Sequence, residues 1–305
     1  MRSATRKRVA ARISLSPGER EGGRALYLAE AEGLIVRADG PSLRIEQPGK
    51  APWYVPPGRV GRAVFWGNVL VESAAIGLLL ADGVPLSFVG RRGETLGLAW
   101  APAENLGPPV RLLDRRRRDP DWVEAYRTLL EAHVREARLE LVRRLAPGVH
   151  RRRAQSGFRS ADWQAWRKTV LTDDPLVDLP WRYLKSLVWE AVTARVRALG
   201  LDPHRGILDS RQPLGFVQEL ARPLVPWIDG AVHWGVRAGL VRRGARGGAP
   251  AEGLSPAVVR RWSARFEGEV AWLERDVTRR IDEVLALARD WQPPVGKLRG
   301  RRRAE

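Results

Sequence analysis

Short apolar runs broken by glycine, proline and aspartate fill the chain from about residue 24 to residue 100. Apolar runs at this spacing are typical of short strands joined by tight turns. Residues 67–80 are predicted to form a strand that leads into a short apolar helix, and residues 83–89 a buried strand. Further strands are predicted at residues 25–28, 34–36, 43–45 and 63–66. We therefore expect an all-β unit in this region.

The spacing of the apolar positions changes from residue 121 onwards. Apolar side chains such as Trp122, Tyr126 and Leu130 then recur every three to four residues, and charged side chains occupy the opposite face, which is the pattern of an amphipathic helix. His133 falls on the apolar face, where we expect a structural role in the core. Further helices are predicted at residues 162–171, 181–199, 213–234 and 255–291.

Composition marks the borders of these regions. Residues 101–120 are rich in proline and include four consecutive arginines, which is typical of a linker. We therefore predict the α+β class, with a β domain before a larger all-α helical domain. The predicted segments are a basic arm at 1–22, the β domain at 23–104, a linker at 105–120, the helical domain at 121–295 and a basic tail at 296–305.

The charge of the chain narrows the class of partner. Its 305 residues include 53 Lys and Arg but only 35 Asp and Glu, a formal net charge of +18, which favours polyanions over small neutral substrates. No stretch reaches the roughly 18 uninterrupted apolar residues of a membrane helix, and the N-terminus lacks the apolar core of an export signal. We expect a cytoplasmic protein with no membrane partner. The absence of cysteine excludes disulfides, thiolate metal sites and cysteine nucleophiles.

Two acids follow a predicted helix–turn–helix corner. Gly200-Leu201-Asp202-Pro203 ends one helix and forms a turn, a short apolar segment leads to Asp209, and Glu219 lies one to two turns inside the next helix. Carboxylates brought together at such a corner suit a hard divalent cation such as Mg2+, which prefers oxygen ligands. Spacing alone leaves open the ordinary alternative of a helix-capping aspartate and a surface glutamate.

This corner resembles the core signature of the CRISPR-associated spacer-acquisition integrase and endonuclease, the Cas-one family. The motif reads Gly-Leu-Asp-Pro, two residues, Gly-Ile-Leu, and then a helix that begins Pro-Leu-Gly-Phe-Val. The resemblance extends to Gly67 and the helix at 73–75, to the 83–88 strand, and to residues 174–178, so that it covers about 24–235. It implies a β-sandwich-like N-terminal domain and a helical C-terminal domain, in agreement with the periodicity.

The resemblance also implies a function. Members of the family are DNA-binding proteins of CRISPR adaptation, homodimers that join the small Cas-two protein and insert short pieces of double-stranded DNA into a CRISPR array. In that reaction a 3′-hydroxyl attacks a phosphodiester bond, and a metal ion stabilises the developing charge. The cofactor implied is Mg2+ or Mn2+.

The family's Glu, His and Asp metal ligands are all altered here. Asp162 stands where the Glu is expected, with Arg167 five positions later, Asp209 replaces the His, and Glu219 replaces the Asp. A competing alignment, anchored on Arg222-Pro223, puts Phe216 at the position of the Asp instead.

Two interpretations of the altered residues are open. Asp162, Asp209 and Glu219 form an all-oxygen catalytic site for Mg2+ or Mn2+, or the site has lost its chemistry. Arg222 would lie on the same helical face as Glu219, where it could pair with that carboxylate and compete with a cation.

Arginine clusters could bind DNA phosphates whether or not the metal site is intact. Three functions are therefore considered: a Cas-one-like protein of CRISPR adaptation with an altered catalytic site, a non-catalytic DNA-binding scaffold subunit of a CRISPR-associated complex, and a general nucleic-acid-binding protein. The candidate nucleic-acid-binding residues are Arg115, Arg116, Arg117, Arg151, Arg152, Arg153, Arg167, Arg222, Arg242 and Arg243.

Overall fold

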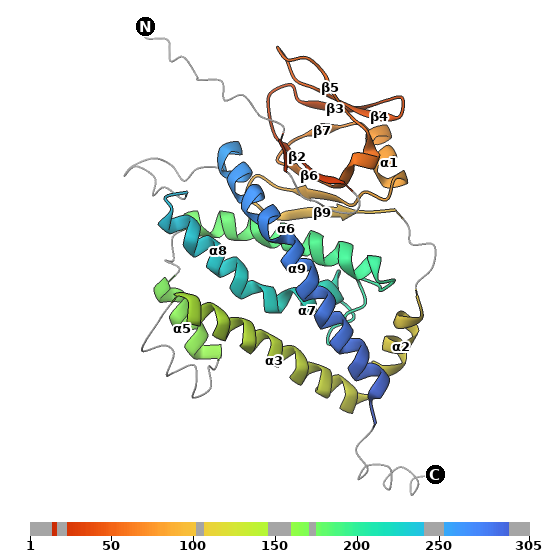
Figure 1. Cartoon of the computed structure of the whole chain (residues 1–305), viewed down its shortest axis with the longest axis vertical. Coiled ribbons are helices and arrows are strands. Elements are labelled where there is room, and N and C mark those ends of the chain that lie inside the picture. The colour runs from red at the N-terminus through yellow and green to blue at the C-terminus, as the bar shows by residue number, and fades with distance from the viewer. Residues whose placement is uncertain are drawn as a thin grey trace, which may run out of the picture. The chain divides into compact units, whose positions relative to one another are not determined.

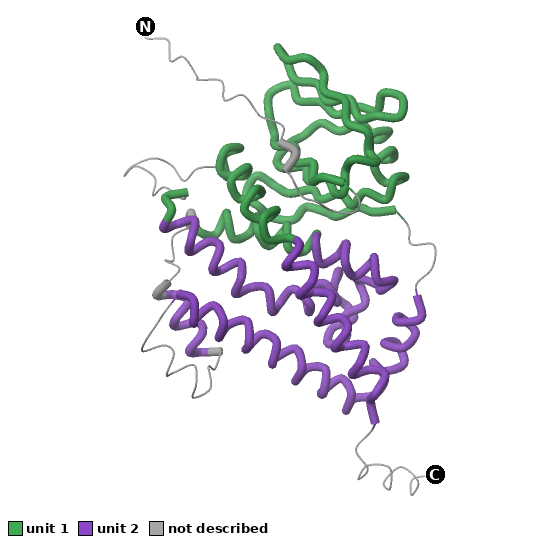
Figure 2. Tube along the Cα trace, in the orientation of Figure 1, with its two compact units in different colours: residues 1–102, 174–190, 238–270 green, residues 103–173, 191–237, 271–305 purple. Residues whose placement is uncertain are grey.

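The computed structural model describes residues 14–16, 23–101, 107–145, 160–170, 175–240 and 253–292. Strands form from the N-terminal part of the chain and helices from most of the rest, which confirms the predicted α+β class (Figure 1). The chain divides into two compact units. Unit 1 consists of residues 1–102, 174–190 and 238–270, and unit 2 of residues 103–173, 191–237 and 271–305 (Figure 2).

Unit 1 contains two sheets. The five-stranded sheet has the order β1 (Ser14–Ser16), β2 (Arg24–Ala29), β6 (Val60–Trp66), β8 (Leu86–Val89) and β9 (Thr95–Ala99), and its three central strands are parallel. The four-stranded sheet has the order β5 (Trp53–Val55), β4 (Ser42–Glu46), β3 (Ile35–Asp39) and β7 (Leu70–Val71). The apolar pattern predicted most of these strands but not β1, β5 and β9.

The two sheets share one apolar core. Side chains alternate across a strand, so Leu26 and Leu28 of β2 face the same core as Val36 of β3 and Ile45 of β4. Helix α1 (Ser73–Ala81), which the sequence predicted, adds Leu79 to this core. The β-sandwich-like arrangement is therefore confirmed.

The other face of the five-stranded sheet carries polar groups that are also buried. Arg62 of β6 is 1% exposed and pairs with Glu190 of α6 (Pro175–Ala198) and Glu267 of α9 (Pro256–Asp290). The Tyr27 hydroxyl donates to Glu267 Oε1 at 2.6 Å. The first parts of α6 and of α9 thus belong to unit 1 together with the sheet, so the chain passes between the compact units near residue 102 and again near residues 173, 190, 237 and 270.

Unit 2 is helical in the part of it that the structure describes. The predicted linker at 105–120 contains a helix, because proline suits the first turn of a helix and Val110 and Leu113 bury one face of this segment. The elements of unit 2 are α2 (Pro108–Arg116), α3 (Pro120–Leu145), α5 (Ser160–Val170), the last part of α6, α7 (Gly215–Ala221), the 3-10 turn η2 (Arg222–Leu224), α8 (Val225–Arg237) and the last part of α9.

The prediction of a single helix at 213–234 is wrong in one respect. The structure divides it into α7, η2 and α8 at Arg222-Pro223, because Pro223 has no backbone N–H to continue the hydrogen bonding of α7. The other helical predictions agree with α3, α5, α6 and α9 to within a few residues at most ends. None of the described helices combines the length and apolarity that crossing a membrane requires.

Candidate functional site

The three acids predicted to hold a metal ion lie in different surroundings. Asp162 is exposed on α5. Asp209 is exposed in the segment between α6 and α7, where its Oδ1 accepts a hydrogen bond from the backbone N–H of Arg211 at 3.0 Å. Glu219 is buried in α7. Within the described residues, no three Asp, Glu, His or Cys side chains are grouped so that they could hold a metal ion.

Four donors of the protein converge on the Glu219 carboxylate. Its Oε2 accepts from the Tyr126 hydroxyl at 2.9 Å and from the backbone N–H of Ile207 at 3.0 Å. Its Oε1 accepts from the backbone N–H of Leu208 at 2.8 Å and, more weakly, of Asp209 at 3.4 Å. A buried carboxylate requires such donors. We call this arrangement the Glu219 cage.

Burial and the neighbouring Glu219 carboxylate keep the Tyr126 hydroxyl, one of the four donors of the cage, in its protonated form. Burial raises the pKa of Tyr126 well above its ordinary value, and the negative charge of Glu219 raises that pKa further. The phenol therefore stays protonated at neutral pH and donates its hydrogen to Glu219.

Two glycines allow the backbone to close around Glu219. A Cβ atom on Gly206 would lie 2.8 Å from Glu219 Oε1 and 2.4 Å from the carbonyl oxygen of Asp209. A Cβ atom on Gly215 would lie 2.6 Å from the same carbonyl oxygen. Both approaches are closer than a side-chain carbon atom tolerates. There is therefore a steric reason why both positions of the signature are glycine in this turn.

A second set of contacts ties the same turn to α2. Arg117 pairs with Asp114 at 2.5 Å and also donates to the carbonyl oxygen of Arg205. The Arg205 side chain in turn pairs with Asp114 at 2.5 Å and with Asp202 at 3.3 Å. The sequence pattern did not predict these contacts or the role of Tyr126, although the i,i+3 spacing of Asp114 and Arg117 indicated part of the network.

Two of the four histidines, His133 and His204, have structural partners. His133 is buried and its Nε2 contacts Glu283, which agrees with the predicted core role, and burial together with the charge of Arg280 lowers its pKa. His204 accepts a hydrogen bond from the backbone N–H of Leu214 at 3.3 Å. Leu214 has a φ of 55°, in the left-handed region that non-glycine residues seldom adopt.

The predicted DNA-binding arginines differ in their environments. Arg115 is exposed on α2. Arg116 donates to the carbonyl oxygen of Ala288 at 2.7 Å, and Arg117 belongs to the network described above, so both have roles within unit 2. The remaining candidates outside the described residues are Arg151, Arg152, Arg153, Arg242 and Arg243.

Arg167 and Arg222 lie in the described part of unit 2. Arg167 Nε is 3.0 Å and 3.1 Å from the two carboxylate oxygens of Asp229. Arg222 is exposed on η2 and forms no ion pair with Glu219, because the Glu219 side chain points into its cage instead. Arg222 therefore makes no direct contact with Glu219 through which it would compete with a cation in the predicted way.

This arrangement of acids does not fit a divalent cation. Both Glu219 oxygens already accept hydrogens that point at their lone pairs, and Mg2+ demands several oxygen ligands in near-octahedral geometry. The three-carboxylate metal site of Asp162, Asp209 and Glu219 stays a prediction that this geometry does not support.

Comparison with known proteins places the chain near one family. The family model described as CRISPR associated protein Cas1 matches residues 26–157. A sequence comparison with curated proteins gives no match. The predicted resemblance to the Cas-one family is thus confirmed, with the match lying mainly in the β region and α3.

Solved structures share the fold over most of the chain. A CAS1 protein from Thermotoga maritima has a TM-score of 0.67 at 12% identity, over 86% of this chain and 97% of its own. A casposase bound to integration product has a TM-score of 0.66 at 15% identity, over 88% and 91%. A chain of a Cas6-RT-Cas1–Cas2 complex has a TM-score of 0.64 at 13% identity, over 92% of this chain and 37% of its own. Identities this low show the fold alone.

Proposed function

With the resemblance to the Cas1 family confirmed, we propose that the chain is a Cas1-like protein of CRISPR adaptation that binds double-stranded DNA and whose catalytic site is altered. The family match over residues 26–157 and the fold shared with a casposase bound to integration product support this proposal. The net charge of +18 supports a polyanionic partner independently. By the same resemblance, the protein acts as a homodimer and joins a Cas-two-like protein or other CRISPR-associated subunits.

The Glu219 cage is the observation that best supports an altered catalytic site. Strand transfer develops negative charge on a phosphodiester, and a metal ion normally stabilises it. The carboxylate at the position of the family's Asp is instead used to hold the turn at residues 207–209. This favours a DNA-binding scaffold over a metal-dependent integrase.

An active integrase is the second candidate. The observation that favours it is the exposure of the Asp162 and Asp209 carboxylates, whose oxygens are the ligand type that Mg2+ and Mn2+ prefer. In this alternative Asp162, Asp209 and Glu219 bind the metal ion and the reaction is a phosphodiester transesterification.

A strand-transfer assay separates the two candidates. Purified protein is incubated with a short duplex and a repeat-bearing plasmid in Mg2+ or Mn2+, and duplex binding is measured in parallel with a chelator present. We expect salt-sensitive binding that Asp209→Ala leaves unchanged, and no joined product. Asp290→Ala, at the exposed end of α9, is the matched control.

Each contrary result has a distinct meaning. Metal-dependent joined products that disappear in Asp209→Ala but persist in Asp290→Ala would establish the integrase and refute the scaffold. Failure of the natural protein to bind any duplex at low salt would refute the DNA-binding proposal itself.

A further inference from the structure

Three arginines from different elements of unit 2 lie in the region of one buried aspartate, Asp229. Asp229 of α8 is 1% exposed, and Arg167 of α5 approaches both of its oxygens, at 3.0 Å and 3.1 Å. Arg138 of α3 lies close enough to both Asp229 and Arg222 of η2 for their charges to affect its pKa. We call these four residues the arginine cluster.

Arg138 is fixed by aromatic packing next to Arg167. Its guanidinium lies 5.4 Å from the centre of the Trp163 ring in α5. Trp163 and Arg167 are four residues apart in that helix, so they share a face. Helix α3 also packs against α8 and η2, which brings Arg138 to the side of unit 2 where Asp229 and Arg222 are found.

The charges within the cluster do not balance. Burial lowers the pKa of Arg138, and the positive charge of Arg222 lowers it further, while Asp229 acts in the opposite direction. Three guanidinium groups and one carboxylate carry a formal charge of 3 − 1 = +2. Two arginines that repel each other at a protein surface are stabilised by an anion that binds between them.

Arg222 provides the open side of the cluster. It is exposed, and its guanidinium has no hydrogen bond or ion pair among the residues that the structure describes. A guanidinium presents a planar fork of N–H donors that matches the oxygens of a phosphate group. Arg138 packs on the Trp163 ring, and Arg167 pairs with Asp229.

We propose that Arg138, Arg167 and Arg222 form a subsite for one phosphate group of the DNA backbone, and that this subsite works without a metal ion. The inference rests on the proposed DNA-binding function and deepens it, because it adds Arg138 and assigns the three side chains to a single phosphate. In sequence, Arg167 follows Asp162 by five residues and Arg222 follows Glu219 by three. Arginine thus supplies positive charge next to the positions where the altered acids do not fit a cation.

Salt dependence counts the phosphates that a protein neutralises. We would measure the affinity of the full chain for a labelled duplex over a range of salt, with a chelator present, for the natural protein, Arg138→Gln, Arg222→Gln and the double variant. Each phosphate contact contributes about 0.9 to the slope of log affinity against log salt. We expect the double variant to lose about 0.9 in slope, not about 1.8, because both side chains bind one phosphate.

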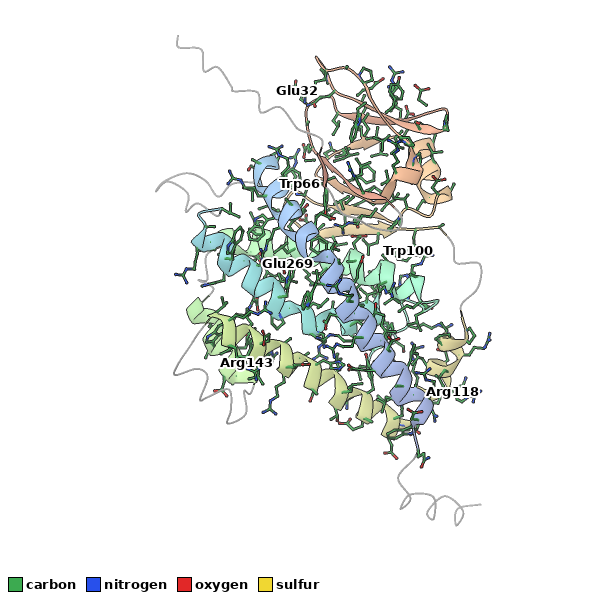
Figure 3. The ribbon with its side chains drawn as sticks, in the orientation of Figure 1. Glu32, Trp66, Trp100, Arg118, Arg143 and Glu269 are labelled. Atoms are coloured by element: carbon green, nitrogen blue, oxygen red, sulfur yellow. The ribbon has the colours of Figure 1, made fainter. Side chains whose placement is uncertain are left out.

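The control variant lies on the same helix as Arg138. Arg143 is exposed near the end of α3 (Figure 3). It pairs with Glu140 at 3.6 Å. Arg143→Gln removes the same charge but should leave the slope nearly unchanged. The far-UV circular dichroism of all variants should match that of the natural protein, and Arg222→Gln, at an exposed position, tests the subsite even if Arg138→Gln is unstable.

A second arm uses inorganic phosphate alone as the probe. Phosphate should raise the thermal unfolding midpoint of the natural protein more than chloride at equal ionic strength, and this difference should vanish in Arg222→Gln. If the protein binds no duplex but retains this Arg222-dependent shift, the proposed function fails and a free-phosphate site stands. If duplex binding is strong and the double variant behaves like Arg143→Gln, the subsite is refuted while DNA binding stands. Loss of both effects refutes both proposals.

Discussion

Glu219 joins three parts of unit 2 through one side chain. From α7 it reaches the hydroxyl of Tyr126 in α3 and three consecutive backbone N–H groups of the turn before α7. A buried carboxylate with four donors has exchanged its hydration shell for fixed protein groups, and its removal leaves those donors without a partner. The side chain therefore acts as a structural anchor for the turn that carries Asp209.

Replacement of either partner in the cage should destabilise the protein. Glu219→Gln turns amide hydrogens toward backbone N–H donors, so we expect a loss of about 2–4 kcal/mol in the free energy of unfolding. Tyr126→Phe removes one hydrogen bond to a charged group and should cost about 1–3 kcal/mol. Urea unfolding followed by tryptophan fluorescence measures both, and the double variant gives their coupling.

The unfolding measurements on Glu219→Gln and Tyr126→Phe need a control variant at the protein surface. Tyr54→Phe removes a hydroxyl from a side chain that is 51% exposed and should change the stability by less than about 0.5 kcal/mol. An increase in stability of Glu219→Gln in chelator would indicate a carboxylate kept for a cation, and would contradict the anchor role.

Secondary elements show what apolar periodicity can and cannot reveal. The alternation in β2 to β4 and β6, and the helical period of α3 and α9, are properties of local sequence and predicted these elements well. The division of the 213–234 region depended on one missing N–H at Pro223. Helix α2 was not predicted, because the Pro-rich, Arg-rich composition of 105–120 masked its two buried side chains, Val110 and Leu113.

The candidate site was less predictable because its contacts are distant in sequence. Glu219 and Tyr126 are 93 residues apart, and Arg167 and Asp229 are 62 apart. A motif can identify Glu219 as important, but the spacing does not distinguish a metal ligand from an acceptor of backbone hydrogen bonds. The same limit applies to Arg116 and Arg117, which a run of four arginines presents as solvent-facing.

Strand β6 meets α6 and α9 through a buried charge. Arg62 is 1% exposed, between Glu190 and Glu267. Burial acts to lower the pKa of Arg62, but the negative charge of Glu190 and its hydrogen bond with Arg62 act in the opposite direction, and the pKa is raised. The arginine therefore stays charged, and the two carboxylates depend on it.

Removal of this arginine should weaken the contact between the sheet and the helices. Arg62→Met leaves two acids buried without their cation, and we expect a loss of about 3–5 kcal/mol. The triple variant Arg62→Met, Glu190→Gln, Glu267→Gln should recover part of that loss, whereas Arg59→Met, at an exposed position before β6, should cost little. Urea midpoints measure the series, and an Arg62→Met variant as stable as the natural protein would show that the charge cluster is dispensable.

Over the whole molecule, unit 1 is built from three separate stretches of the chain. Residues of α6 and α9 cover the outer face of the five-stranded sheet. These helices begin at residues 175 and 256, about 75 and 155 positions after the last strand ends at residue 99. A domain defined from the N-terminal strands alone lacks this cover. Composition indicates the boundary near residue 104, close to the first passage between the units at residues 102–103, but it gives no sign of the later passages near residues 173, 190, 237 and 270.

A fragment that ends at residue 102 should therefore fail to fold independently. It would expose Tyr27, Arg62, Val64 and the rest of the outer sheet face, and exposed sheet surface of this kind promotes aggregation. Gel filtration and a thermal melt followed by circular dichroism test this, with the full chain as control. A monomeric fragment with a cooperative melt would show that the α6 and α9 segments are not needed.

The Glu219 cage has a consequence for how such a protein can evolve. The chain closes the turn at residues 206–215 with its own donors, acceptors and glycines, so the shape of the turn does not require an ion. The exposed Asp209 side chain accepts a hydrogen bond from the backbone N–H of Arg211 but does not take part in the cage, so selection on chemistry is the stronger constraint on its identity. A lineage that retains the cage can gain or lose a reaction by single substitutions on its rim while it inherits the same architecture.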